Sequence, residues 1–233
     1  VNPSGAITVP EAGSTEIAAR LGSIDTFERK GEVIFLDSFE HGLNKWVTGV
    51  QGSGSSVELL ATSARNGGYS CQLTANPDAG DFGLIIRSLP YPTVSRYGLE
   101  TSWTYNPVTG SLEMWIELFD GAVQYIGAIR YLASTGYYQF LDSAGAWQNA
   151  VLAKIVGSNA VLYYTSKLVI DLVTKQYARA IFNDQPVDLS SQALRQVASA
   201  TTPRLRITIA NYCAASSTSL SSVDDVILTH NEP

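Results

Sequence analysis

The folded part of this chain opens on Leu36-Asp37-Ser38-Phe39-Glu40-His41-Gly42-Leu43-Asn44-Lys45-Trp46 and closes on Ser222-Val223-Asp224-Asp225-Val226-Ile227-Leu228-Thr229. Between them lies a third distinctive segment, Ser63-Ala64-Arg65-Asn66-Gly67-Gly68-Tyr69-Ser70-Cys71-Gln72-Leu73-Thr74. From Val33 onward, apolar and polar residues alternate at period two between turn signals, which is the pattern of β-strands. The sequence therefore predicts an all-β domain.

The alternation places the expected strands at residues 59–62, 69–75, 82–87, 97–105, 112–119, 123–131, 137–141, 167–173, 177–183, 204–213 and 223–229. Turn residues separate three neighbouring pairs of segments, at Asp120-Gly121, Thr174-Lys175 and Asn183-Asp184. Short helices are expected at residues 14–22 and 189–198 only. Many short strands separated by turns indicate two packed antiparallel sheets.

The three segments resemble the opening, third strand and closing strand of carbohydrate-binding-module-like and concanavalin-like jelly rolls. The stretch 167–184 is similar to a hairpin of concanavalin-like sandwiches. The resemblance implies a two-sheet antiparallel jelly-roll β-sandwich over residues 33–233, preceded by an extended N-terminal arm over residues 1–32. Because one fold hosts many functions, it implies less about activity than about architecture.

Composition excludes several functional classes. The chain of 233 residues has a formal net charge of −6, which argues against a nucleic-acid partner because such a partner needs a basic face. No apolar run approaches the roughly 18 residues of a membrane span. Cys71 and Cys213 share strand parity with apolar neighbours, which favours two buried free thiols. A disulfide between them is the alternative and would favour an oxidising compartment.

The N-terminal arm favours an assembly role. Residues 1–13 are small, polar and proline-bearing, and an extended arm buries little surface on itself. We therefore expect another subunit to hold it, as in homo-oligomers or particles built by exchange of arms. The arm, the Phe39-Glu40-x-Gly42-Leu43 motif and the closing Asn231-Glu232-Pro233 are also similar to uncharacterised phage-associated structural proteins.

The start of the chain has no signal-peptide pattern. This fits a component of a virion or other extracellular particle that is assembled in the cytoplasm. The alternative is a secreted protein whose leader has been removed.

No catalytic centre is predicted. His41 and His230 lie near element ends, and no nucleophile elbow or zinc-ligand spacing accompanies them. Glu113-Met114-Trp115-Ile116-Glu117 is similar to the Glu-x-Asp-x-Glu strand of concanavalin-like glycoside hydrolases, but Trp115 replaces the central acid. Retaining hydrolysis needs two carboxyls within about 5.5 Å, whereas residues four apart on a strand lie roughly 13 Å apart. We expect no enzymatic activity, with glycoside hydrolase as a minor alternative.

The same strand offers a contact surface. Its even-numbered residues are apolar and belong in the core, whereas its odd-numbered residues, Glu113, Trp115, Glu117 and Phe119, form the other face. Tyr125 and Tyr131 on the next strand are expected to widen this face. An exposed aromatic patch of this kind marks a contact, either with a covering protein segment or with a glycan.

A calcium site is the last candidate. In the jelly rolls that this chain resembles, calcium bridges the first and last strands through an acid after the initial Phe and an Asp of a closing Asp-Asp pair. Glu40, Asp224 and Asp225 match those positions, with Asp37 nearby, and calcium prefers hard oxygen ligands. The alternative is that these acids are solvated turn residues that cap strand ends.

These features lead to two main hypotheses. The first is a non-enzymatic structural protein of an assembled particle, such as a virion decoration, capsid-associated or tail component. The second is a secreted carbohydrate-binding module that stacks glycans on Trp115.

Overall fold

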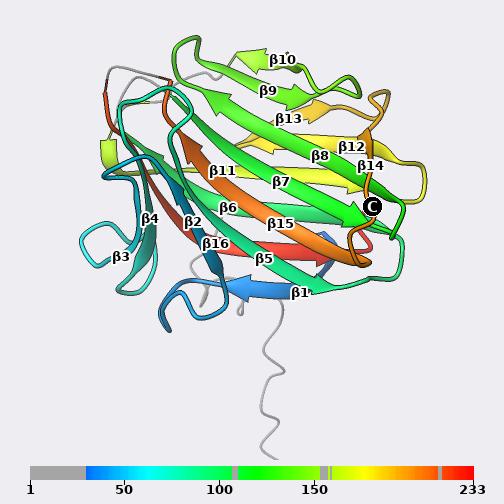
Figure 1. Cartoon of the computed structure of the whole chain (residues 1–233), viewed down its shortest axis with the longest axis horizontal. Helices are drawn as coiled ribbons and strands as arrows, with labels where there is room; N and C mark the ends of the chain where they lie inside the picture. The colour runs from blue at the N-terminus through cyan, green and yellow to red at the C-terminus, as the bar shows by residue number, and fades with distance from the viewer. Residues whose placement is uncertain (1–29, 107–109, 153–156, 158, 215–216) are drawn as a thin grey trace, which may run out of the picture.

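The computed structural model describes residues 30–106, 110–152, 157, 159–214 and 217–233, and its strands form two antiparallel sheets of eight strands each. The two sheets pack face to face, as Figure 1 shows. The described residues contain no helix. The predicted two-sheet jelly-roll β-sandwich is therefore confirmed. The described part of the chain also holds no helix with the length and apolar character of a membrane span.

The front sheet faces the viewer in Figure 1. Its strands, in spatial order, are β10 (Trp147–Leu152), β9 (Tyr137–Leu141), β8 (Val123–Leu132), β7 (Ser111–Phe119), β15 (Arg204–Tyr212), β5 (Phe82–Pro90) and β2 (Val47–Gln51). The eighth strand, β14 (Arg195–Ala198), pairs with the first part of β8. The central position of β7 puts its outward side chains at the middle of this sheet.

The back sheet lies behind it. Its strands, in spatial order, are β13 (Gln185–Asp188), β12 (Gln176–Phe182), β11 (Asn159–Asp171), β6 (Arg96–Tyr105), β16 (Ser219–His230), β4 (Ser70–Ala75) and β3 (Ser56–Leu60). β1 (Glu32–Asp37) pairs with β16, so the opening and closing segments of the sequence lie side by side.

The predicted turns are confirmed. Asp120-Gly121 joins β7 to β8, and the Asp120 carboxylate accepts hydrogen bonds from the backbone amides of Ala122 (2.9 Å) and Val123 (2.7 Å). Lys175 and Asn183 adopt positive φ values of 60° and 50° in the two turns that flank β12. Asn reaches this left-handed region more readily than most residues.

The helix predicted at residues 189–198 is wrong. Leu189 and Leu194 are instead buried in the core, and Arg195–Ala198 forms β14 against β8. Tertiary pairing to an open strand edge overrides local helix propensity here. The helix predicted at residues 14–22 lies outside the described residues.

The core lies between the two sheets and is rich in aromatic rings. Trp103 packs against Tyr131 and Tyr164, each with ring centroids 5.5 Å away, and Phe182 is 6.2 Å from it. Aromatic pairs at these separations add to the stability that burial provides. Cys71 and Cys213 are both free and buried, which confirms the expectation of two thiols.

Candidate functional site

The outer face of the front sheet, called here the front face, carries the aromatic residue singled out in the sequence. On β7, Met114 and Ile116 are at most 2% exposed and point into the core, so their odd-numbered neighbours point outward. Trp115 is half-buried at the centre of this face. Glu113, Glu117 and Phe119 share the face with Trp115 but are nearly buried.

The register between β7 and β8 corrects one expectation. Trp115 lies opposite Ala128, whereas Leu118 lies opposite Tyr125. Directly opposed residues share a face of the sheet, so Tyr125 is on the core side, where Tyr131 is also buried. The prediction that these two tyrosines widen the platform is therefore wrong. β8 contributes a different set of side chains to the front face, namely Gln124, Ile126, Ala128 and Arg130.

Glu117 is held by a two-pronged ion pair. Arg206 on β15 donates from Nε to Oε2 and from Nη2 to Oε1, both at 2.6 Å. Gln124 Nε2 donates a third hydrogen bond to Oε1 at 2.6 Å. Parallel bonds of this kind fix geometry as well as charge. The carboxylate of Glu117 is therefore neutralised and fixed in position.

Glu113 is held by residues of β7 itself and of β8. Ser111 Oγ donates to Oε1 (3.1 Å), and Trp115 Nε1 donates to Oε2 (3.1 Å). Arg130 Nη1 on β8 lies 3.5 Å from Oε1. Burial raises the pKa of Glu113, and Arg130 acts in the opposite direction. The bond that Trp115 Nε1 donates to Glu113 also fixes the orientation of the indole.

A second tryptophan extends the aromatic surface. Trp147 on β10 meets Trp115 edge to face, with ring centroids 5.8 Å apart. The Arg130 guanidinium lies 4.3 Å from the Trp147 ring centroid and donates from Nε to Gln139 Oε1 at 2.7 Å. These rings pack over a small apolar cluster of Ile126, Ala128 and Leu141, separate from the main core.

A hollow of about 230 Å³ lies next to Trp115 on the side of β15 and β5. It is lined by Leu84, Ile86, Trp115, Glu117, Arg206, Thr208 and Tyr212. Burial and, to a smaller extent, the negative charges of Glu113 and Glu117 together raise the pKa of Tyr212 to about 12. The Tyr212 hydroxyl is therefore protonated at neutral pH.

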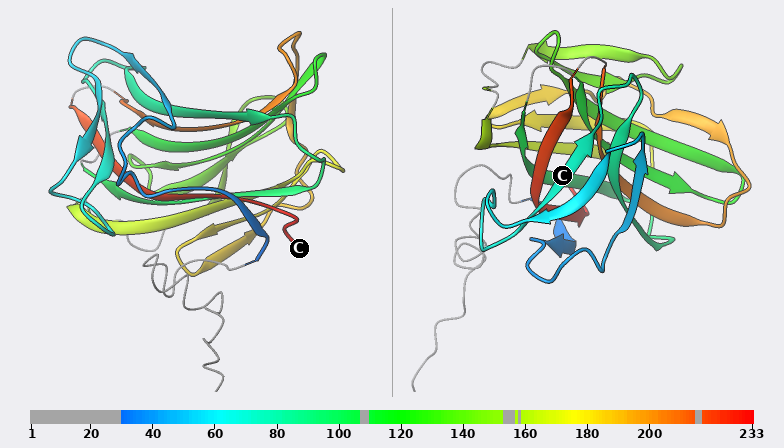
Figure 2. Two further views of the ribbon diagram at one scale, coloured as in Figure 1. Left: turned by 90° about the horizontal axis from the view of Figure 1, so that it is seen from below. Right: turned by 60° about the vertical axis from the view of Figure 1, so that its left-hand side comes forward.

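The front face lies between two raised ends. Figure 2 (left) shows the segment around β14 and the β7–β8 hairpin rising at one end, and the segment that joins β2 to β3 rising at the other. An open face with raised ends, an aromatic ring at its centre and fixed polar groups around the ring is suited to an extended polar chain.

The two glutamates that flank Trp115 on β7 have different arginine partners. Glu113 is directed toward Arg130 on β8 and Glu117 toward Arg206 on β15, so the two carboxylates turn away from each other. Burial raises the pKa of Glu113 despite its arginine partner, whereas Glu117 is held by two parallel bonds from Arg206.

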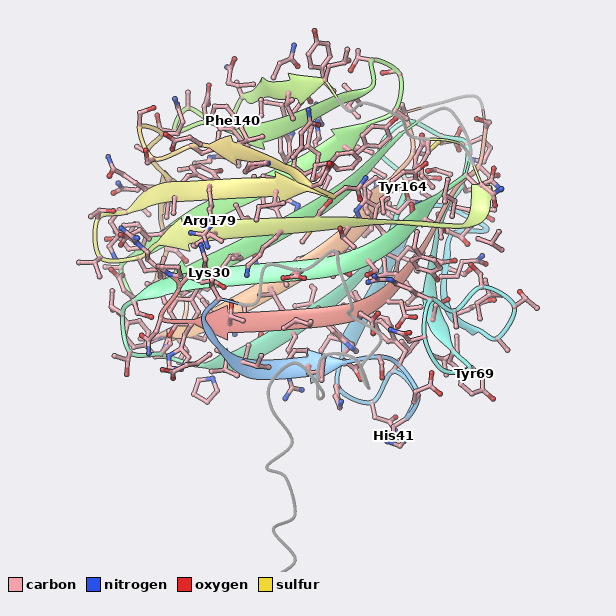
Figure 3. The ribbon with its side chains drawn as sticks, turned by 180° about the vertical axis from the view of Figure 1, so that it is seen from behind. Lys30, His41, Tyr69, Phe140, Tyr164 and Arg179 are labelled. Carbon is pink, nitrogen blue, oxygen red and sulfur yellow. The ribbon has the colours of Figure 1, made fainter. Side chains whose placement is uncertain are left out.

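The three acids of the predicted calcium site meet at one loop. Glu40 Oε1 accepts hydrogen bonds from the backbone amides of Gly68 (2.9 Å) and Tyr69 (3.0 Å). Asp224 Oδ2 accepts from the amides of Arg65 (2.8 Å) and Asn66 (3.2 Å). The carboxylates therefore anchor residues 65–69, a loop within the third distinctive segment of the sequence. Figure 3 shows Tyr69 beside β4 and His41 on the loop after β1.

The environment of Asp225 disfavours the charged form of its carboxylate. Asp225 adopts φ 49°, and its Oδ2 accepts a 2.8 Å hydrogen bond from Asn66 Nδ2. Burial and the neighbouring Asp224 raise the pKa of Asp225 to about 7, although Arg65 acts in the opposite direction. Asp37 is oriented differently, because it accepts a 2.7 Å bond from Trp46 Nε1.

Among the described residues, no group of three or more His, Cys, Asp or Glu side chains is arranged to hold a metal ion. Both Asp224 oxygens and one Glu40 oxygen accept bonds from backbone amides, so this oxygen set fits calcium poorly in this geometry. The calcium site stays a prediction.

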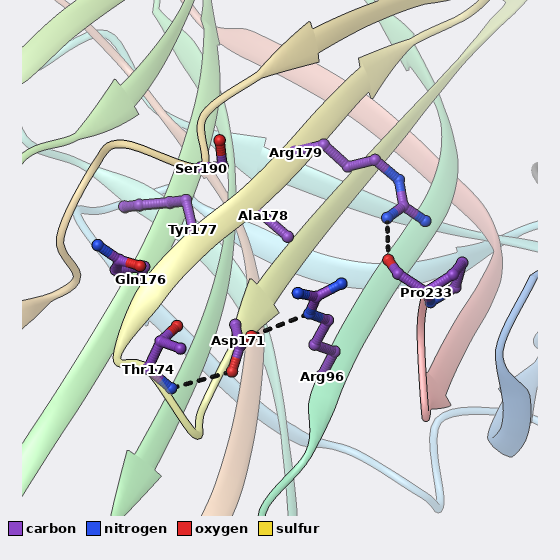
Figure 4. A pocket seen from close by; sticks show the side chains of 9 residues that line it. All are labelled: Arg96, Asp171, Thr174, Gln176, Tyr177, Ala178, Arg179, Ser190 and Pro233. Carbon is purple, nitrogen blue, oxygen red and sulfur yellow. Dashed lines mark hydrogen bonds and ion pairs between the residues drawn. The ribbon is translucent and has the colours of Figure 1, made fainter.

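The back sheet has a charged network on its outer face. Lys167 Nζ lies 2.8 Å from Glu232 Oε1 and 3.6 Å from Glu100 Oε2, and Arg179 Nη2 lies 2.8 Å from Glu232 Oε2. A shallow cavity of about 210 Å³ lies nearby, lined by residues that include Arg96, Asp171 and Arg179. Figure 4 shows that Arg96 is directed toward Asp171 and Arg179 toward Pro233. This cavity has no exposed aromatic ring comparable to Trp115.

No protein-family model and no curated protein sequence matches the chain. Solved structures do. An endo-β-1,4-glucuronan lyase from the fungus Trichoderma reesei is similar with a TM-score of 0.61 and 10% identity, over 86% of this chain and 96% of that one. A Bacillus subtilis protein of unknown function with a galectin-like fold has a TM-score of 0.59 and 8% identity, over 88% and 98%.

An alginate lyase from a Chlorella virus has a TM-score of 0.56 and 8% identity, over 85% of this chain and 100% of the other. At these identities the likeness establishes the fold, which is a concanavalin-like and galectin-like jelly roll shared with proteins that handle carbohydrates. The site itself must supply the argument for function.

Several residues of the front face were not anticipated. The position of Arg130 opposite Glu113 follows from the β7–β8 register, which can be predicted by counting outward along both strands from the Asp120-Gly121 turn. Arg206 and Tyr212 lie beside β7 only because β15 inserts between β7 and β5. Trp147 reaches Trp115 across two further strands. No local sequence signal encodes these long-range neighbours.

Proposed function

We propose that this protein binds an extended glycan on the front face and does not cleave it. The observation that carries the proposal is the half-buried Trp115 ring, which lies beside a hollow lined by both apolar and polar side chains and is oriented by its own bond to Glu113. An indole face is apolar and suits the C–H face of a sugar ring. The surrounding fixed donors and acceptors suit its hydroxyls.

Preorganisation supports the proposal. Glu117, Arg206 and Gln124 hold one another in position before any ligand arrives. A site whose polar groups are already fixed loses less conformational entropy on binding. The hollow of about 230 Å³ is below the roughly 300–1,000 Å³ of pockets that enclose a small molecule. It is therefore sized for one unit of a chain that continues across the sheet.

The experiment is a glycan screen followed by calorimetry on the full chain. We expect binding that Trp115→Ala weakens by about 30-fold, as expected when an anchor worth about 2 kcal/mol is removed. Tyr69→Ala is the matched control, because Tyr69 is an exposed aromatic residue on the loop anchored by Glu40. Equal loss in both variants, or no binding at all, contradicts the proposal. Chain-length analysis of the recovered glycan tests the absence of cleavage.

The assembly role through residues 1–32 stays a prediction, because residues 1–29 lie outside the described part of the chain. It is compatible with glycan binding, since a particle surface is one place where a glycan-binding face is useful. The solution mass of the full chain, compared with a chain that starts at Gly31, tests it. An oligomer that becomes a monomer without the arm supports the assembly role, and monomers in both cases contradict it.

A further inference from the structure

We infer that the hollow beside Trp115 takes a sugar unit without negative charge, so that the ligand of the front face is a neutral polysaccharide rather than a polyuronate. This inference rests on the proposed function and adds the chemical class of the ligand. It follows from the ion pairs that the charged residues around the hollow already form with one another.

The charged groups that line the hollow cancel each other. Glu117 and Arg206 are the charged residues of its lining. The Arg206 guanidinium uses both Nε and Nη2 on the Glu117 carboxylate, each at 2.6 Å. A ligand carboxylate would have to compete with Glu117 for this guanidinium. Breaking a partly buried ion pair without replacing it is costly.

The second arginine of the front face is also occupied. Arg130 lies on the far side of Trp115, where it contacts Gln139, Glu113 and the Trp147 ring. Arg204 lies 5.2 Å from the Phe119 ring centroid and is not part of the hollow's lining. The hollow therefore offers a ligand carboxylate no guanidinium that lacks a partner.

The electrostatic environment of Tyr212 points the same way. Burial is the main cause of the raised pKa of this phenol, and the charges of Glu113 and Glu117 raise it as well, so both carboxylates act on this edge of the hollow even though arginines pair with them. A uronate placed here would meet the same field, and like charges at close range disfavour binding. A hydroxymethyl group would instead donate to a carboxylate oxygen and accept from Thr208, Tyr212 or Arg206.

The test uses two probes that differ only at C6. One is a β-1,4-glucan oligosaccharide and the other is the β-1,4-glucuronan oligosaccharide of the same length. If the screen selects another neutral chain, that chain and its C6-oxidised form replace them. We expect the neutral member to bind at least about 10-fold more tightly to the full chain. Its affinity should change little with salt, because no net charge is neutralised.

Variants separate charge from shape. Glu117→Gln keeps the side-chain size but leaves Arg206 without its carboxylate, and it should increase uronate affinity at least about 10-fold relative to the wild type. The double variant Glu117→Gln/Arg206→Gln removes both charges and should show no such gain. If Glu117→Gln does not fold, Glu113→Gln frees Arg130 and makes the same prediction on the other side of Trp115.

The outcomes separate the two claims. Tighter binding of the uronate by the wild type, lost in Trp115→Ala, overturns the inference about ligand class and leaves glycan binding in place. No Trp115-dependent binding of either probe or of any screened chain overturns the proposed function as well. A neutral preference that Glu117→Gln leaves unchanged overturns the electrostatic explanation.

Discussion

Two groups of acids in this molecule have different partners. On the front face, Glu113 and Glu117 are each paired with an arginine from a neighbouring strand. At the loop of residues 65–69, Glu40 and Asp224 are bonded to backbone amides, and Asp225 lies beside Asp224. The first group produces a surface without net charge at its centre. The second fixes a loop while retaining a buried like-charge contact.

The difference shows how the same side chains form ion pairs on a sheet face in one region and anchor a loop in the other. An arginine partner balances a carboxylate and presents further donors to a ligand. Backbone amides satisfy a carboxylate without adding a full positive charge. Burial raises the pKa values of Asp224 and Asp225, and the backbone amides that bond Asp224 act in the opposite direction.

Arg206→Gln tests the front face with the largest expected effect. It leaves the nearly buried Glu117 carboxylate without its ion pair, and we expect a loss of about 2–3 kcal/mol in the free energy of unfolding, since Arg206 keeps some solvent contact. Denaturant unfolding measures this change. Arg96→Gln is the control, because Arg96 forms a more exposed pair with Asp171 and should cost under about 1 kcal/mol. Equal losses would contradict the special role of the Arg206 pair.

Much of the fold was predictable because it depends on local rules. Alternation at period two and the Asp120-Gly121, Lys175 and Asn183 turns place most of the strands. β10, β13 and β14 lacked a clear signal because they lie at or near sheet edges, where half-exposed residues alternate weakly. Residues 189–198 are predicted as a helix because their apolar spacing fits either structure.

The centre of the site was predictable, and its surroundings were not. The alternation of β7 alone places Trp115 opposite the core. The partners that make it a site come from β8, β10 and β15, whose order in the sheet depends on long-range pairing. Tyr125 and Tyr131 show the same limit, because strand composition does not specify which face a tyrosine joins. The register of the β7–β8 hairpin determines which face each tyrosine joins.

Asp225→Asn tests the second region through pH. The folded-state pKa of Asp225, about 7, lies above its unfolded value of 3.8, so the folded protein holds the proton more tightly. Its contribution to stability is complete below the unfolded pKa and is lost as pH rises through about 7. Relative to the wild type, the variant should gain about 1–3 kcal/mol between about pH 4 and pH 8.

Unfolding at both pH values, with Glu58→Gln as a control on the exposed β3, measures this gain. The same pH slope in Asp225→Asn and wild type would contradict the account. A calcium-induced rise in Tm that requires Asp225 would support the calcium prediction instead.

Trp147→Ala tests the edge of the front face with the smallest expected effect. Trp147 supports Trp115 edge to face and carries the Arg130 guanidinium. Its loss should weaken glycan binding by about 5-fold, or about 1 kcal/mol, which is less than the loss from Trp115→Ala. Calorimetry with the chain selected by the screen gives the comparison. A larger effect from Trp147→Ala would move the centre of the site toward β10.

The most direct test of the central claim follows the four tryptophan indoles by NMR during a titration with the selected neutral glycan. Trp46 and Trp103 lie in the core and donate to Asp37 and Ser166, so they serve as internal references. The account predicts that the indole N–H signals of Trp115 and Trp147 shift while the signals of Trp46 and Trp103 stay in place. Saturating binding that leaves the Trp115 signal unchanged would contradict it.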